Sequence, residues 1–152
     1  ETDFPAPFAR LETVLLPLSE AVVVPHPITC RHLHSWMNLA PLRDLRDPAT
    51  PAPVAADDSG RSAQRFIVDV RVRRSHRAGR AIASGRDIYA VTAPLLIEAL
   101  QRILDGRARA SGVLAAGQAF DARDFLDALA SEVITLTFEA AVLVDAGSIA
   151  AC

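Results

Sequence analysis

The chain has 152 residues, of which 51% are hydrophobic and 22% charged, a composition typical of a folded globular protein and not of a disordered one. Its 16 basic residues, all arginine, are offset by 18 acidic ones, and the net charge of −2 gives no electrostatic case for binding nucleic acid or an anionic membrane. The length fits one domain with enough chain to bury a core.

Prolines interrupt the first 40 residues. Residues 1–9 contain Pro5 and Pro7 and are predicted to be an entry linker. The apolar run of residues 11–24 is divided at Pro17, which cannot lie in a central strand, so we expect two short elements there. Residues 26–39 alternate loosely in polarity and are predicted to form a strand.

Three possible metal ligands alternate along this predicted strand. Cys30, His32 and His34 would share one of its faces, where their side chains could converge on an ion. A structural site usually needs four ligands, and no other His or Cys lies near enough to complete the set. We therefore expect a partly buried strand face and no metal.

Residues 40–63 change character, because they contain four prolines and many small polar residues. They predict a long surface connection with a turn of helix at its start. Within them Asp57-Asp58-Ser59-Gly60 resembles the start of a cation-binding loop, but lacks the alternating acids and the distant Glu. We interpret this stretch as a solvated turn.

The clearest strand signal covers residues 65–73, which alternate with a period of two. A polar segment with Gly79 follows, and then "AIASGRDIYAV", so the two runs predict an antiparallel hairpin. Its Arg-bearing face and open edges predict self-association through the sheet. The expected apolar face carries Phe66, Val68, Val70 and Val72, and the opposite face carries Arg65, Ile67, Asp69, Arg71 and Arg73.

After the hairpin the period changes to that of a helix. Thr92 is expected to cap it and Gly106 to end it, with one apolar stripe along its length. A second helix is expected after Asp121, and residues 133–144 have strand composition. The stripe of the first helix comprises Leu96, Ala99, Leu100, Ile103 and Leu104, and the inward residues of the second are Phe125, Leu126 and Leu129. The sequence thus predicts an α+β fold, with a largely antiparallel or mixed sheet and helices packed on one face.

The stretch "GRDIYAVTAP" is the strongest candidate for a binding site. Arg86, Tyr89 and the backbone N–H groups of a helix that starts at Thr92 could together bind a carboxylate. The alternative is structural: Arg86 would pair with an acid of the partner strand, and Tyr89 would pack on the sheet.

Several functions lack their sequence signals. No GxGxxG follows a strand and no P-loop is present, so no nucleotide cofactor site is expected in this chain. No Ser-His-acid or Cys-His set has a recognisable context, so no catalytic residue is assigned.

Cys30 and Cys152 lie far apart, which favours a reducing, cytoplasmic compartment. Charged residues and Pro17 break the apolar runs, so no membrane span is expected.

Three segments carry a resemblance to a known family. They are "MNLAPLRDLRDPATPAP", the hairpin with the helix after it, "RFIVDVRVRR…HRAGRAIASGRDIYAVTAPLLIEALQRIL", and "GVLAAGQAFDARDFLDAL". Residues 37–129 resemble the C-terminal half of saccharopine dehydrogenase-like oxidoreductases. Those proteins join an N-terminal Rossmann domain, which binds NAD or NADP, to a second α+β domain that contributes to the substrate cleft and to dimerisation.

The resemblance implies that residues 1–152 are one domain, the C-terminal part of a longer protein. Expected partners are a second copy, an N-terminal Rossmann domain carrying NAD or NADP, and a small-molecule substrate. The substrate-side residues implied are Arg86, Asp87, Tyr89 and Thr92. The alternative is a non-catalytic oligomerisation or protein-interaction module.

Overall fold

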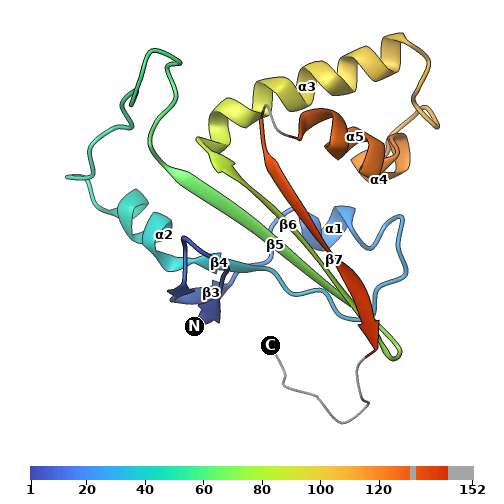
Figure 1. Ribbon diagram of the computed structural model, residues 1–152, viewed down its shortest axis with the longest axis horizontal. Coiled ribbons are helices and arrows are strands. Elements are labelled where there is room, and N and C mark those ends of the chain that lie inside the picture. Colours follow the sequence, from blue (N-terminus) through green and yellow to red (C-terminus); the bar gives the residue numbers. More distant parts are fainter. Residues whose placement is uncertain (131–132, 144–152) are drawn as a thin grey trace. The chain divides into compact units, whose positions relative to one another are not determined.

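The computed structural model describes residues 1–130 and 133–143, and the chain divides into two compact units (Figure 1). The N-terminal unit contains Glu1–Pro53 and Arg107–Ala122, and the sheet unit contains Val54–Gly106 and the chain from Arg123 onward. Whether the two units fold as one domain, as the sequence predicts, stays a prediction.

The N-terminal unit is built from short elements. Two small antiparallel sheets form it, β1 with β2 and β3 with β4. The strands are β1 (Thr2–Asp3), β2 (Arg10–Leu11), β3 (Thr13–Leu15) and β4 (Trp36–Asn38), and the helices are α1 (Glu20–Val23), α2 (Leu39–Arg46) and α4 (Ala116–Ala119). The expected break at Pro17 is confirmed, because a strand ends before it and a helix begins after it.

The strand predicted over residues 26–39 is wrong except at its end. Only Trp36–Asn38 pairs, opposite Thr13–Leu15. The partner strand β3 has only three residues, so it can pair with only three residues of β4. Pro25 and Pro27 also lack the N–H that a longer ladder would need.

Helix α2 follows the strand directly and is the helical turn expected at the start of the long connection. The side chain of Asn38 caps it by accepting a hydrogen bond from the backbone N–H of Ala40 at 3.0 Å. Beyond Arg46 no further helix or strand forms until Arg65, so the expected surface connection is confirmed.

The sheet unit is organised around a three-stranded antiparallel sheet in the order β5-β6-β7, whose strands run side by side in Figure 1. The strands are β5 (Arg65–Arg74), β6 (Arg77–Arg86) and β7 (Thr135–Leu143). The loop expected around Gly79 is shorter than predicted, because Ser75 and His76 alone make the turn and Gly79 lies in the ladder opposite Val72. Ser75 adopts a φ of 52°, which allows this tight closure.

Asp69 organises the polar face of this sheet. Its carboxylate accepts hydrogen bonds from Arg80 Nε at 2.9 Å, Arg80 Nη2 at 2.8 Å and Arg71 Nη2 at 2.9 Å. Arg80 also reaches Glu139 on β7 at 3.0 Å, so side chains of all three strands are linked. Burial raises the pKa of Asp69, but the hydrogen bonds from Arg80 and Arg71 outweigh burial and hold that pKa below its usual value.

Two helices cover one end of the apolar face of the sheet. Helices α3 (Ile88–Leu104) and α5 (Ala122–Leu129) pack against it through a buried cluster of Val91, Leu129 and Ile134. Partly buried neighbours complete this core, namely Phe66, Leu95, Phe125, Leu126, Val133 and Leu136. The α+β prediction is confirmed, and so is the inward side of α5.

The apolar face of β5 is covered only at its Phe66 end. Val68, Val70 and Val72 follow Phe66 on that face and remain exposed. Phe138 of β7, which pairs with Ala81 of β6, is also exposed. The guanidinium of Arg123 lies 4.1 Å from the centre of the Phe138 ring. Alternation along β5 therefore identifies the apolar face but not how much of it the helices cover.

Helix α3 differs most from its sequence-based prediction. It begins at Ile88, not after Thr92, and Pro94 lies inside it. The predicted apolar stripe exists but faces outward, since Leu96, Leu100 and Ile103 are 65%, 50% and 57% exposed.

The side of α3 that faces the core carries both of the helix's charges. Arg102 is 2% exposed and binds three groups: the side chain of Glu98 at 2.6 Å, the carboxylate of Asp124, and the backbone carbonyl of Asp124 at 3.0 Å. Its guanidinium also lies 5.2 Å from the centre of the Phe125 ring.

Replacing Gly85 by Ala should destabilise the sheet unit. A Cβ at Gly85 would stand 2.8 Å and 2.9 Å from two ring atoms of Phe66, so the ring would have to shift within the core. Overpacking of this kind costs about 1–3 kcal/mol. The matched control is Gly79→Ala on the same strand, where the new Cβ would meet Val72 at 3.5 Å, an ordinary contact. Urea unfolding of both variants checks this, and equal midpoints would contradict it.

Candidate functional site

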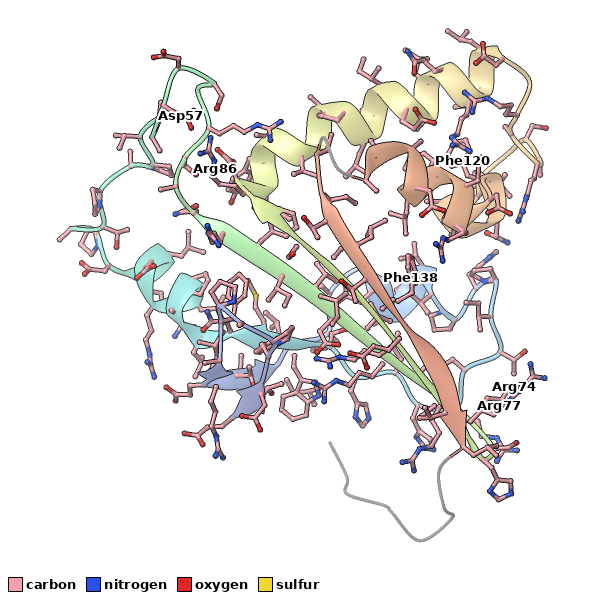
Figure 2. The ribbon with its side chains drawn as sticks, viewed as in Figure 1. Asp57, Arg74, Arg77, Arg86, Phe120 and Phe138 are labelled. Atoms are coloured by element: carbon pink, nitrogen blue, oxygen red, sulfur yellow. The ribbon has the colours of Figure 1, made fainter. Side chains whose placement is uncertain are left out.

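Arg86, the last residue of β6, is held by the long connection (Figure 2). Its Nη1 lies 2.7 Å from Asp57 Oδ2, and its Nη2 donates a hydrogen bond to Ser59 Oγ at 2.9 Å. The residue opposite Arg86 on β5 is Arg65, so the predicted structural alternative, an acid of the partner strand, is wrong. The two arms of the guanidinium instead bind the Asp57 carboxylate and the Ser59 hydroxyl, both from a loop.

The electrostatics of this pair follow from the contacts. The hydrogen bond from Arg86 is the largest cause that holds the pKa of Asp57 well below its ordinary value, and hydrogen bonds from Ser59 add to it. The same contact raises the pKa of Arg86. Both groups therefore stay charged across the physiological pH range. Because both side chains are well exposed, the pair contributes little to folding stability.

Asp87 is both the N-cap of α3 and an anchor for the loop. Its carboxylate accepts hydrogen bonds from the backbone N–H of Ser62 at 2.8 Å and of Ala90 at 3.1 Å. These two bonds are the main causes that lower its pKa. The N-terminus of α3 is therefore capped by the chain's own carboxylate, and the prediction that its N–H groups are open to a ligand is wrong.

The remaining two candidates lie apart from this contact. Tyr89 is 79% exposed in the first turn of α3, and Thr92 is exposed one turn further along. No hydrogen bond joins either side chain to Arg86 in the described part of the chain. The structure thus brings Arg86 and Asp87 to the loop of residues 57–62, and leaves Tyr89 and Thr92 on the helix surface.

Sequence reasoning missed the loop as a component of the site. An open, shallow depression of about 630 Å³ is lined by Asp57, Asp58, Ser59, Arg61 and Arg86. The stretch was interpreted as a solvated turn, and its backbone does turn there, with Gly60 at a φ of 73° and Asp57 accepting from Ser59 N–H at 3.0 Å. Two acids before a Ser-Gly turn could have indicated a partner for a nearby arginine, but the sequence alone does not show which arginine.

A second, smaller depression of about 410 Å³ lies at the tip of the hairpin. Arg74, His76 and Arg77 line it together with Ser75 and Leu143, and Figure 2 shows the two arginines at the end of the sheet. Arg74 and Arg77 stand opposite each other in the ladder, where two like charges repel.

The residues weighed as metal ligands do not form a site. Cys30, His32 and His34 lie in a loop, not on a strand face, and the Cys30 thiol contacts the backbone carbonyl of His32 at 2.9 Å. Across residues 1–130 and 133–143, no group of three or more His, Cys, Asp or Glu side chains could hold a metal ion. Cys152 lies outside the described residues.

Among the helices that are described, none combines the length and the apolar character needed to cross a bilayer.

Comparison with protein-family models, with curated proteins and with solved structures found no match to this chain. The resemblance to saccharopine dehydrogenase-like oxidoreductases therefore stays a prediction that rests on the quoted segments alone.

Proposed function

We propose that this chain is the substrate-binding and dimerisation domain of an NAD(P)-dependent oxidoreductase resembling saccharopine dehydrogenase, and that it is inactive without a nucleotide-binding domain. One observation carries the proposal. Arg86 pairs one guanidinium nitrogen with the carboxylate of Asp57 and the other with the Ser59 hydroxyl, at the edge of an open depression and next to the strand-to-helix junction that the resemblance assigns to the substrate.

In this proposal Asp57 occupies the position that a substrate carboxylate takes during turnover. An exposed ion pair is weak, typically below about 1 kcal/mol, so a substrate can displace Asp57 at little cost. The two hydrogen bonds that Asp87 accepts hold the junction and the loop in place while Asp57 moves into water. Tyr89 and Thr92 offer further polar contacts from the surface of α3. The hydride comes from the nicotinamide held by the other domain.

The test uses the natural protein that contains this chain. We expect it to oxidise or reduce a nicotinamide nucleotide with some member of a panel of amino acids and keto acids, measured by near-ultraviolet absorbance. Arg86→Ala should raise KM by up to about fivefold, because an exposed ion pair contributes at most about 1 kcal/mol. Asp57→Asn should lower KM, because it weakens the internal competitor for Arg86.

The matched control is Arg10→Ala, since Arg10 forms an exposed ion pair with Glu1 and does not line the depression. We expect its KM to stay within about twofold of the parent value, an exposed charge contributing little at a distance. A natural protein that binds no nicotinamide nucleotide would contradict the proposal. A KM that is unchanged in Arg86→Ala would remove Arg86 from the substrate site.

A second candidate function is a non-catalytic interaction module. The outward face of α3, which is largely apolar and carries no charge, favours it, because exposed apolar patches mark association surfaces. In that case the natural protein would contain no nucleotide-binding domain, and neither Arg86 nor Asp57 would affect any reaction.

A further inference from the structure

Arginines stand directly opposite each other at three places in the ladder between β5 and β6. The pairs are Arg65 with Arg86, Arg71 with Arg80, and Arg74 with Arg77. Residues that stand opposite each other in an antiparallel ladder place their side chains on the same face of the sheet, and two like charges in that position repel. An anion held between the two guanidinium groups removes this repulsion.

The first two pairs are supplied with an acid by the chain itself. The Oδ2 atom of Asp69 accepts hydrogen bonds from Arg71 Nη2 at 2.9 Å and from Arg80 Nη2 at 2.8 Å, so one carboxylate bridges two opposed arginines. At the end of the ladder next to α3, Asp57 Oδ2 lies 2.7 Å from Arg86 Nη1. The sheet therefore shows how an oxyanion is held by opposed arginines of these two strands.

The third pair, at the tip of the hairpin, has no such acid. Among the described residues, no carboxylate forms an ion pair with Arg74 or Arg77. The acids of the described strands β5, β6 and β7 are Asp69 and Glu139, and both bind Arg80. The tip is thus the one place in the described ladder where opposed arginines lack a carboxylate of the chain.

The depression at the tip offers the groups that bind an oxyanion. Arg74 and Arg77 line it together with the turn residues Ser75 and His76, and Figure 2 shows both arginines at the end of the sheet. No acid is among its described lining residues, whereas the depression around Arg86 contains two. Ser75 has a φ of 52°, where glycine is usual, and backbone strain of this kind is concentrated at functional sites.

We propose that the hairpin tip binds a phosphate group, with the guanidinium groups of Arg74 and Arg77 on its oxygens. A phosphate monoester carries a charge of about −1.5 to −2 at neutral pH, so it balances both arginines, whereas a carboxylate balances only one. The planar guanidinium fork also matches pairs of phosphate oxygens. Ser75 adds a hydroxyl donor and His76 a ring N–H.

The phosphate belongs to a soluble phosphate ester or to the headgroup of a lipid phosphomonoester, which share this chemistry. The tip lies at the opposite end of β6 from Arg86, about 30 Å away by the rise of the strand. The phosphate site is therefore separate from the site around Arg86, and it does not rest on the proposed enzymatic function.

Titration of the chain of 152 residues with inorganic phosphate tests the site through the backbone amide resonances of Ser75 and His76. With chloride keeping the ionic strength constant, we expect their shifts to saturate with a dissociation constant on the order of 1 mM, because exposed charge pairs are weak. Arg74→Gln and Arg77→Gln should each raise that constant about fivefold, and the double variant should not saturate. The matched control is Arg46→Gln, which removes the same charge from an exposed position of α2 and should leave the constant unchanged.

Several outcomes of this titration would overturn the proposal. Shifts that persist in the double variant would mean that phosphate binds elsewhere. Equal affinity for acetate at the same ionic strength would mean that the tip does not select a doubly charged anion. Saturation that appears only in Asp145→Asn would mean that Asp145, which lies outside the described residues, already neutralises the tip.

Unfolding in urea gives a readout that does not depend on resonance assignment. Phosphate should raise the midpoint of the parent chain above its value in chloride, because a ligand that binds the folded state stabilises it. Arg77→Glu supplies an acid opposite Arg74, so phosphate should raise the midpoint of this variant less. The same increase in both chains would be a general effect of phosphate on protein stability and would contradict the site.

Vesicles distinguish the two sources of phosphate. Sedimentation with vesicles of phosphatidylcholine and phosphatidic acid, but not of phosphatidylcholine alone, supports a lipid headgroup if the double variant loses it. Binding of inorganic phosphate without sedimentation supports a soluble phosphate ester. A chain that binds neither inorganic phosphate nor phosphatidic acid overturns the proposal.

Discussion

Replacing Arg102 by Ala should lower the free energy of unfolding by about 3–5 kcal/mol, the largest effect that we expect from one polar residue. The guanidinium is almost fully buried and satisfies Glu98, the carboxylate of Asp124 and a backbone carbonyl. Burial alone would lower the pKa of Arg102, but the hydrogen bonds to Asp124 and Glu98 raise it, so the side chain remains charged in the core. Without it, the mostly buried carboxylate of Glu98 would lose its ion pair with Arg102.

Chemical unfolding followed by circular dichroism measures this loss. Arg102→Lys should lose less than Arg102→Ala, because it keeps the charge but not the fork that reaches several oxygens at once. The matched control is Arg10→Ala, which removes an exposed ion pair to Glu1 and should cost less than about 1 kcal/mol. If Arg102→Ala unfolds at the same midpoint as Arg10→Ala, the buried network contributes nothing to stability.

Replacing Leu129 by Ala should cost about 2–5 kcal/mol, because it opens a cavity in the small core of the sheet unit. Leu129 is 5% exposed and packs with Val91 and Ile134 where α3, α5 and the start of β7 meet. Only four hydrophobic residues in the described part of the chain are buried, so each has few neighbours that could fill the gap. Thermal or urea unfolding provides the measurement.

Leu143→Ala is the control for this core substitution. Leu143 ends β7 and is well exposed, so its truncation should change stability by no more than about 0.5 kcal/mol. Similar losses in both variants would mean that the cluster around Leu129 is not the core on which the sheet unit depends.

The sequence predicts the α+β class, the β5–β6 hairpin and the inward face of α5, because each has a strong local pattern. Which side of α3 faces the core was not predictable in the same way. Apolar residues occur on nearly every side of this helix, so periodicity finds a stripe without showing which side is covered. The deciding feature is the pairing of Arg102 with Asp124, two residues that are 22 positions apart.

The start of α3 was misplaced for a similar reason. Thr92 followed by Pro94 is a typical beginning of a helix, whereas Asp87 caps from a left-handed conformation, with a φ of 58°, that N-caps seldom adopt. Pro94 is tolerated inside the helix although it removes one hydrogen bond to the carbonyl of Ala90. The candidate site depended on the same long-range information, because the partner of Arg86 lies 29 residues earlier in a proline-rich loop.

The division of the chain has a consequence for its synthesis on the ribosome. The sheet unit needs β7, but residues 107–122, which belong to the other unit, are made between α3 and β7. Until β7 emerges, β6 has an unpaired edge and the apolar face of the hairpin lacks Ile134 and Leu136. Nascent chains that stall in this interval would expose a strand edge beside an uncovered helix, the combination that chaperones bind and that aggregates recruit.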